Sequence, residues 1–304
     1  MDLEPRLRAF GAVARRRSFS GAAADLAISQ PAISKHVADL ERKLDLQLVQ
    51  RGQQGSTLTP AGEFLANHIL RAEAILAQAI RGVAEFRHPG AGALSIVASG
   101  IPGTYLLPEV IGVFHLAHPN VRIALQLQTS ASAVEWLRAH RAELGVVGGF
   151  AAAPEIEAEA LVEDTIILVG PRQLEGRRMS RRELESLTWI SREEGSASRA
   201  AVEAAWRDLG FVPTRRLELP SWEAVKLAVI QGTGIAACSR FAVESELHRG
   251  AVVLIRFRPW NVRRTISIIR VRDASLTPSA TKFLTMLRAR WGQQSAHRAQ
   301  VTGA

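Results

Sequence analysis

The sequence predicts a multidomain α/β protein with a helical N-terminal domain, a long connecting helix and a larger C-terminal domain of two α/β subdomains. Three patterns predict this organisation. Two short helical segments lie around a bend within residues 20–44, and one long helical period covers residues 60–87. From residue 93 onward, apolar strand-like runs alternate with helical segments, which predicts a mostly parallel sheet with ligands bound at the strand ends.

The first pattern is a pair of short helices joined by a tight bend. Ser20 is predicted to cap the first helix and Ser29 the second, where Pro31 is tolerated in the first turn. The second helix carries apolar residues at steps of four, three and four, which predicts one buried stripe. These residues are Ile33, Val37, Leu40 and Leu44.

The polar side of the second helix suits the major groove of double-stranded DNA. Gln30, Ser34 and Lys35 lie off the apolar stripe, and Ser29 and Pro31 open the helix. Glutamine can pair with adenine, and lysine with guanine or a phosphate. We therefore predict that these five residues form a DNA-reading surface. The alternative is an ordinary solvated surface helix, because amphipathic helices with a lysine are common.

A short hairpin is predicted to follow the reading helix. Apolar or β-branched residues at 48–50 and 57–59 flank a glycine-containing tip, with Arg51 at the base. Such a hairpin acts as a wing, and Arg51 is predicted to contact backbone phosphates. Residues 1–59 are therefore predicted to form a winged helix-turn-helix domain.

The long helix at 60–87 is predicted to hold two copies of the chain together. Thr59 can cap it, and Pro60 suits its first position. Six apolar residues follow steps of four and three, the heptad spacing of a helix that packs against its own copy. They are Leu65, Ile69, Ala72, Leu76, Ala79 and Val83. The alternative is packing on the chain's own C-terminal domain.

Residues 88–92 contain proline and glycine and predict a hinge before the C-terminal domain at 93–293. The strand–helix alternation predicts subdomain I at about 93–163 and 269–293, and subdomain II at about 164–268. Two crossings between the subdomains would create a hinged cleft. The last residues, 294–304, are expected to form a flexible tail.

The predicted cleft gathers groups suited to a small anion. Hydroxyls and glycines follow predicted strands, and one loop adds an arginine at the start of a helix, where free amides attract negative charge. The predicted binding residues are Ser99, Gly100, Thr129, Ser130, Ser196 and Arg199. The alternative for the last loop is helix capping by a serine, with Arg199 in solvent.

Composition and motifs argue against several other functions. The net charge of +9 fits a polyanionic partner, and no apolar run approaches the roughly 20 residues of a membrane span, so a cytoplasmic protein is expected. Cys238 is the only cysteine and lies in an apolar run, which favours a buried thiol over a redox sensor. His115 and His118 lack a third ligand nearby. We predict no metal site, no cofactor and no catalytic residue.

The N-terminal residues resemble the winged helix-turn-helix of LysR-type transcriptional regulators. The resemblance runs through Phe10, Ser18-Phe19, Ala22–Ala24, Leu26, Ile28–Ser34, Leu40-Glu41, Leu44, Arg51 and Leu58–Gly62. It departs from the family pattern at Asp45, where glycine is usual, and at Val49, where phenylalanine is frequent. The resemblance implies a linker helix that pairs two subunits and an effector domain similar to periplasmic binding proteins. It also implies a homodimer or homotetramer, with RNA polymerase as a candidate partner.

Three further segments resemble the branch of that family that regulates carbon fixation and cysteine or sulfur metabolism. They are Glu194–Arg199, Trp222–Val229 and Gly232–Ala236. The expected function is sequence-specific DNA binding controlled by a small anionic metabolite. Two alternatives remain at this point: an enzyme or transport-type binding protein with an added helical domain, and an architectural DNA-binding protein without an effector.

Overall fold

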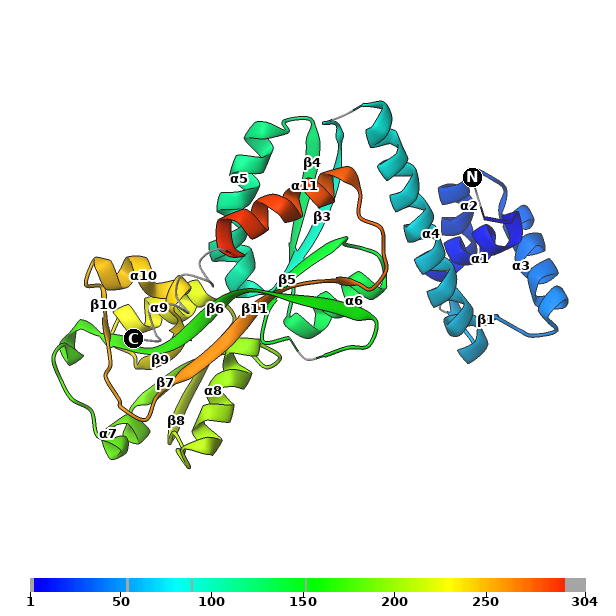
Figure 1. Cartoon of the computed structure of the whole chain (residues 1–304). Coiled ribbons are helices and arrows are strands. Elements are labelled where there is room, and N and C mark those ends of the chain that lie inside the picture. The colour runs from blue at the N-terminus through cyan, green and yellow to red at the C-terminus, as the bar shows by residue number, and fades with distance from the viewer. Residues whose placement is uncertain (1–2, 53–54, 89, 151, 293–304) are drawn as a thin grey trace. The chain divides into compact units, whose positions relative to one another are not determined.

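The computed structural model describes residues 3–52, 55–88, 90–150 and 152–292 (Figure 1). The chain divides into two compact units, Met1–Val83 and Ala84–Ala304. The division falls inside the long helix α4, Pro60–Arg87. The predicted tail at 294–304 and residue 89 of the predicted hinge lie outside the described residues. Within the described ranges, no helix has both the length and the hydropathy of a membrane span.

The N-terminal unit is a winged helix-turn-helix. It contains α1 (Pro5–Arg16), α2 (Phe19–Leu26), α3 (Gln30–Leu44), β1 (Val49–Gly52), β2 (Gly55–Leu58) and the first part of α4. The two strands pair in antiparallel register from Val49↔Leu58 to Gly52↔Gly55. One core joins the helices and the hairpin, because apolar residues from every element meet in it. The core includes Phe10, Val13, Ile33, Val37, Leu40, Leu48, Ala66 and Ile69.

Most of the predicted helix starts are confirmed, and one is wrong. The Ser29 hydroxyl accepts the Ala32 N–H at 3.3 Å, and Thr59 Oγ1 accepts the Gly62 N–H at 3.0 Å. The cap of α2, however, is Ser18, whose hydroxyl accepts the Gly21 N–H at 3.1 Å. The predicted cap Ser20 lies in the first turn, because the helix begins two residues earlier than the alanine run indicates.

The buried stripe of α3 is confirmed at three of its four positions. Ile33, Val37 and Leu40 are buried, whereas Leu44 is 43% exposed. Leu44 is the last residue of α3, and the chain turns away after it through Asp45, which adopts the left-handed conformation with φ of 51°.

We expect Asp45→Gly to stabilise the protein. A residue other than glycine in the left-handed conformation costs roughly 1–2 kcal/mol of folding free energy. Glycine avoids this cost, but its greater freedom in the unfolded chain lowers the stability of the folded state by about 0.5–1 kcal/mol. The net gain in free energy of unfolding is therefore about 0.5–1 kcal/mol, measured by urea unfolding. Asp45→Ala, which keeps the strain, is the control, and equal stabilities of the two variants would contradict the interpretation.

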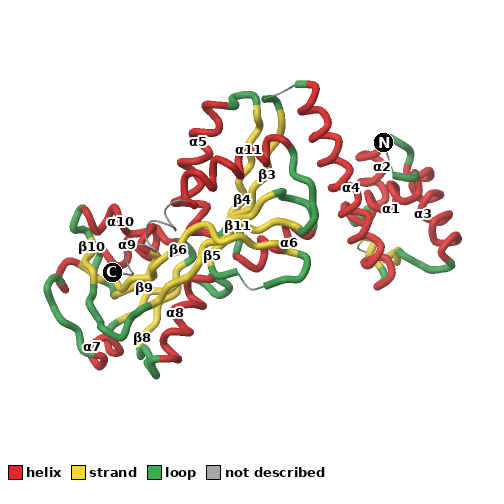
Figure 2. The backbone as a smooth tube through the Cα atoms, viewed as in Figure 1, coloured by secondary structure: helices red, strands yellow, loops and turns green. Residues whose placement is uncertain are grey.

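The C-terminal unit is built on one continuous sheet, visible as the yellow strands in Figure 2. The strand order is β4-β3-β5-β11-β6-β9-β7-β8, and β10 pairs with β6. Two groups of parallel strands lie at its two ends. The first group is β3 (Gly92–Ala98), β4 (Val121–Leu127) and β5 (Leu144–Gly148). The second group is β7 (Thr188–Arg192), β8 (Arg215–Leu219) and β9 (Ile235–Ser239).

Two long antiparallel strands join these groups, so the chain passes twice between the subdomains, as predicted. They are β6 (Ile156–Pro171) and β11 (Val262–Val271), which pair along their length from Val271↔Ile156 to Val262↔Ile166. On one side β11 pairs with β5, and on the other β6 pairs with β9. The acidic residues at 155–164 lie mostly within β6, and one of them, Asp164, is fully buried.

Helices cover the sheet around these strands (Figure 1). They are α5 (Leu107–Ala117), α6 (Ser130–Arg138), α7 (Arg181–Ser186), α8 (Ala197–Asp208), α9 (Trp222–Ile230), α10 (Arg240–His248) and α11 (Pro278–Leu287). Short π-helical segments lie at Pro102–Leu106 and Arg288–Gly292, and a 3-10 turn at Arg172–Leu174. Two elements between β9 and β11 are not predicted from the sequence, α10 and β10 (Val252–Leu254).

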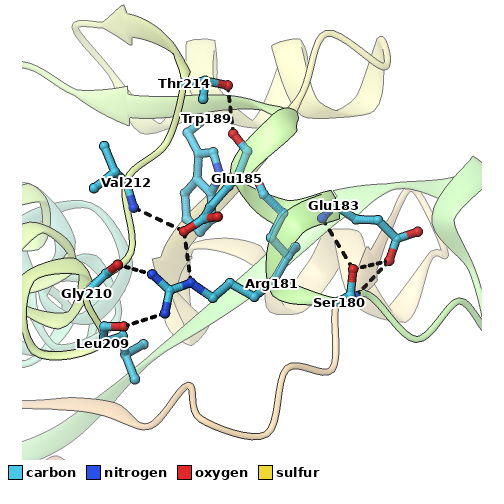
Figure 3. A network of polar contacts seen from close by, with 10 residues as sticks. Ser180, Arg181, Glu183, Glu185, Trp189, Leu209, Gly210, Val212 and Thr214 are labelled. Atoms are coloured by element: carbon cyan, nitrogen blue, oxygen red, sulfur yellow. Dashed lines mark hydrogen bonds and ion pairs between the residues drawn. The ribbon is translucent and has the colours of Figure 1, made fainter.

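Much of the basic loop before β7 is structural. Arg181 Nε donates to Glu185 Oε1 at 2.9 Å, and its terminal nitrogens donate to the backbone carbonyls of Leu209 and Gly210 (Figure 3). Ser180 and Glu183 form a capping box at the start of α7, and these bonds hold the pKa of Glu183 below its usual value. The positive charge of the chain therefore includes an arginine, Arg181, that fastens α7 to the end of α8.

The last turn of α4 belongs to the C-terminal unit. Glu85 is buried, and its Oε2 accepts the Ser279 N–H at 2.9 Å and the Ser279 hydroxyl at 2.8 Å. Ser279 lies in the first turn of α11, where free amides favour a carboxylate. This contact explains why the compact division precedes the predicted hinge at 88–92.

Candidate functional site

The exposed side of α3 is the first candidate site. Gln30, Pro31 and Lys35 are exposed, and Ser34 is half-buried beside them. Ser29 lies at the start of the helix, where its hydroxyl is used as the cap. The five residues thus lie at the start and in the first turns of α3, outside the stripe that packs into the core.

The wing is attached to α3 by a residue whose role the sequence analysis missed. Glu41 Oε1 accepts the backbone N–H groups of Leu48 at 2.8 Å and Val49 at 3.0 Å. Arg51 lies in β1, and its side chain is outside the described part of the chain. Glu41 therefore fixes the start of β1 relative to α3.

The predicted subunit seam of α4 divides into two parts. Ile69 is buried in the core of the N-terminal unit, and Leu65 packs against the same core. Ala72 and Leu76 are half-buried, whereas Ala79 and Val83 are exposed, Val83 by 65%. The exposed apolar side chains Ile75, Ile80 and Phe86 accompany them. Leu65 and Ile69, at the N-terminal end of the seam, therefore pack within the N-terminal unit. Ala79 and Val83, at the C-terminal end, form an exposed apolar surface.

The second candidate site is a cavity of about 460 Å³ in the C-terminal unit. It is lined by residues at the ends of β3 and β4 and by residues of β7, α8 and α9. Its lining includes Ser99, Gly100, Thr129, Ser130 and Ser196, all predicted from the sequence. The lining also includes Thr104, Tyr105, Arg192, Trp222 and Arg264, which the sequence analysis did not select.

Backbone bonds fix the hydroxyls on one side of the cavity. Ser99 Oγ accepts the Gly148 N–H at 3.0 Å, and Ser130 Oγ donates to the Gly148 carbonyl at 2.9 Å. Thr129 caps α6 through the Ser132 N–H at 3.1 Å. These contacts hold the ends of β3, β4 and β5 together at one rim.

The other side of the cavity presents a helix start with an unused hydroxyl. Ser196 is the N-cap residue of α8, but its side chain makes no capping hydrogen bond. Gly195 before it has φ of 82°, a conformation that favours glycine. The structure therefore contradicts the capping alternative for Ser196, and its hydroxyl lines the cavity beside the first amides of α8.

Arg199, which was predicted from the sequence to bind the anion, is not among the residues that line this cavity. Its Nε donates to Glu203 Oε1 at 2.9 Å and its Nη1 to Glu218 Oε2 at 2.5 Å. Arg199 instead lines an adjoining cavity of about 300 Å³, to which Ser130 and Ser196 also contribute. Its position in the first turn of α8 turns it toward β8, a neighbour that the sequence alone does not identify.

The arginines that do line the cavity are Arg192 and Arg264. Arg192 binds Glu193 through two hydrogen bonds of 2.7 and 2.6 Å and lies over the Trp222 ring. Arg264 pairs with the buried Asp164. Burial raises the pKa of Asp164, and the charge of Arg264 opposes that shift. One polar contact crosses the cavity, from the Tyr105 hydroxyl to Glu223 Oε1 at 3.3 Å.

The only cysteine, Cys238, is buried in β9, and burial raises the pKa of its thiol far above the usual range. Because the thiolate is the reactive species, we expect no reaction with a disulfide reagent at pH 8 in the native protein. One thiol per chain should react after unfolding in guanidinium. Rapid labelling of the native protein would contradict the buried position.

A DNA-reading head and a two-sided cleft together define a class of protein, the ligand-responsive DNA-binding regulators. The family model "Bacterial regulatory helix-turn-helix protein, lysR family" matches residues 5–63. The model "LysR substrate binding domain" matches residues 87–292. The chain therefore belongs to the LysR family of transcriptional regulators.

Named relatives agree with this family. The chain is 28% identical over 291 residues to the HTH-type transcriptional regulator CysL of Bacillus subtilis (strain 168), covering 95% of this chain and 97% of that protein. It is 32% identical over 273 residues to a probable RuBisCO transcriptional regulator of Porphyra purpurea, covering 86% of each. Full-length CbnR, solved in complex with its target DNA, has the same fold, with a TM-score of 0.68 at 21% identity over 94% of this chain and 99% of CbnR.

Proposed function

We propose that this protein reads a specific double-stranded DNA site and that a small anionic metabolite, bound in the C-terminal cavity, controls transcription from that site. The DNA-contacting residues in this proposal are those on α3 and the wing. They are Ser29, Gln30, Pro31, Ser34, Lys35 and Arg51. The accessible polar side of α3 and the bond network from Glu41 to the wing support it.

One observation carries the effector part of the proposal: a single cavity is lined from both subdomains by hydroxyls, a helix start and arginines. A helix N-terminus and a guanidinium both favour negative charge, and hydroxyls can donate to oxyanions. The volume of about 460 Å³ fits a small organic anion rather than a polymer. Carboxylates, phosphate esters and sulfur oxyanions share this chemistry.

The position of the cavity also provides a route to regulation. A ligand that contacts both subdomains favours the conformations in which they lie close, by its difference in affinity for the open and closed forms. The Tyr105 hydroxyl already donates a hydrogen bond to Glu223 across the cavity, so polar groups from both sides are in place to hold a closed form. A typical coupling of about 1–3 kcal/mol would suffice to change how the assembly occupies DNA.

We further propose a homodimer that places two reading helices on successive half-sites, with a homotetramer as the assembly of two dimers. The apolar surface left by Leu76, Ala79 and Val83 supports pairing through α4. RNA polymerase is the expected protein partner at the promoter. The effector is bound and released unchanged, because the family relatives are named as regulators.

The experiment that tests the effector proposal is calorimetry of the full chain against phosphorylated sugars, dicarboxylates and sulfur oxyanions, followed by footprinting with any ligand found. We expect Ser196→Ala to weaken the bound anion roughly tenfold, because one hydrogen bond to a charged group contributes about 1.5 kcal/mol. Operator affinity without ligand should not change. Ser245→Ala, on the exposed side of α10, is the matched control.

Two results would contradict this proposal. If no anion binds, the cavity does not hold an anionic effector. If the best ligand is converted to product by the purified protein, the enzyme alternative is correct. A ligand that binds unchanged and alters the footprint supports the regulator.

A further inference from the structure

A buried ion pair lies at the floor of the cavity, on the two strands that join the subdomains. Arg264 of β11 and Asp164 of β6 are direct partners in the strand register. Arg264 Nε donates to Asp164 Oδ2 at 2.9 Å. The Arg264 side chain is 6% exposed, and the Asp164 side chain is not exposed at all.

This pair lies between the two halves of the sheet. On the subdomain I side, the pairing of β11 with β5 begins at Ile266↔Gly148. On the subdomain II side, the pairing of β6 with β9 begins at Ile166↔Ser239. Arg264 and Asp164 lie just beyond both ladders, at the crossover itself.

Each member of the pair contacts one half. The Ser239 hydroxyl, at the end of β9, donates to Asp164 Oδ1 at 2.7 Å. The Arg264 guanidinium lies over Gly148, at the end of β5, where an added Cβ would be 3.2 Å from Cζ. The Gly148 backbone is also the group that Ser99 and Ser130 bind. The pair is thus linked to the strand ends that form the cavity.

Arg264 has hydrogen-bond donors left over. A guanidinium has five N–H donors, and Asp164 receives a hydrogen bond from Nε alone. Nη2 lies 2.9 Å from the same Asp164 oxygen, yet this buried atom has no hydrogen-bond partner among the residues that the structure describes. A buried donor without a partner is costly, and Arg264 lines the cavity. An oxyanion in the cavity would provide the acceptor.

The other two arginines near the cavity are differently engaged. Arg192 uses Nε and Nη2 on Glu193, and Arg199 is held by Glu203 and Glu218. Their charges are balanced by carboxylates that are partly exposed. Arg264 differs because its one carboxylate partner, Asp164, is fully buried and also accepts a hydrogen bond from Ser239.

We propose that Arg264 is the effector-binding cation of the cleft and that Asp164 limits the strength with which it binds an anion. This inference rests on the proposed function and names the group that reads the effector's carboxylate, phosphate ester or sulfur oxyanion. The anion accepts hydrogen bonds from the terminal nitrogens of Arg264, while Nε stays on Asp164. Both residues lie on β6 and β11, the strands that join the two subdomains. A bound anion therefore acts directly on the connection between the subdomains.

The test compares neutral variants of the pair in the full chain. The probes are inorganic phosphate and sulfate, measured against chloride at matched ionic strength, and the readouts are thermal unfolding and calorimetric affinity. Asp164→Asn removes the internal counter-ion, so we expect it to bind phosphate and sulfate several-fold more tightly, up to about tenfold. A purely structural ion pair predicts weaker binding or none.

The second variant is the double substitution Arg264→Gln with Asp164→Asn. It leaves no unpaired buried charge, so the fold should be retained, and we expect at least about a tenfold loss of anion affinity. The matched controls are Arg263→Gln and Glu163→Gln. This neighbouring cross-strand pair is 3.1 Å apart and about half exposed, so both controls should bind like the parent.

The outcomes separate this inference from the proposed function. If the parent responds to phosphate and sulfate and the double variant responds equally, Arg264 is not the anion's ligand and the inference is wrong, while the anionic effector stands. If the parent shows no anion-specific response, the anionic effector and this inference both fail. Tighter binding in Asp164→Asn together with loss in the double variant supports the assignment.

Discussion

Replacing Gln30 and Ser34 together by alanine is expected to abolish most of the discrimination between the operator and random DNA. Both side chains lie on the accessible side of α3, and Gln30 is exposed at its first turn. Each good base contact contributes about 1–3 kcal/mol, so losing two should weaken operator binding by roughly 30-fold or more. Binding curves on the operator and on a random duplex at one salt concentration measure this ratio.

The fold should be unaffected by this double change, because the α3 core residues Ile33, Val37 and Leu40 are retained. Lys43→Ala, on the exposed last turn of α3, is the control for a general loss of charge. It should weaken operator and random DNA by similar factors, since a phosphate contact does not distinguish sequences. An unchanged operator-to-random ratio in the double variant would show that α3 is not the reading helix.

Leu76→Glu is expected to dissociate the dimer and, with it, to lose high-affinity binding to a two-half-site operator. Leu76 is half-buried and lies at the start of the apolar surface that it forms with Ala79 and Val83. In a symmetric pair the two new carboxylates would face each other within an apolar contact, at a cost of several kcal/mol. We expect the dimer dissociation constant to rise by at least about 100-fold, as measured by sedimentation equilibrium.

Arg81→Glu is the matched control for this change. It introduces the same side chain on α4 only five residues away, but the helical period places it on the opposite side from Leu76. The Arg81→Glu control should remain dimeric. The N-terminal domain of the Leu76→Glu variant should still bind a single half-site, but weakly. If Leu76→Glu sediments like the parent, α4 pairs through another surface or the subunits meet elsewhere.

Burial in the structure refines which part of α4 is free to pair. Leu65 and Ile69 satisfy the heptad spacing, yet they pack against α1 and its neighbours in the N-terminal unit. A heptad pattern reports only that one side of a helix is apolar. Which body covers that side depends on the neighbouring elements. The pairing surface is therefore proposed to begin near Leu76 and to reach Val83, which is 65% exposed.

The sequence by itself was sufficient for the helical N-terminal domain, the two-crossing α/β domain and the order of their elements apart from α10 and β10. Helix caps such as Ser29, the buried stripe of α3 and the strand-length apolar runs are local signals, because they depend on residues a few positions apart. Local signals also placed Ser99 and Ser130 after strands and Ser196 before a helix, and all three line one cavity. Errors of local origin were small, such as Ser20 taken as the cap in place of Ser18.

The tertiary structure alone decided which charged groups meet. Arg199 is drawn to Glu218 of β8, nineteen positions along the chain. Arg264 reaches the cavity floor because β11 returns beside β6 and places it opposite Asp164, one hundred positions earlier. Periodicity cannot identify such partners, because an arginine's reach covers any carboxylate that the fold brings near it. The proposed role of Arg264 therefore depends on strand register and burial, which the sequence does not supply.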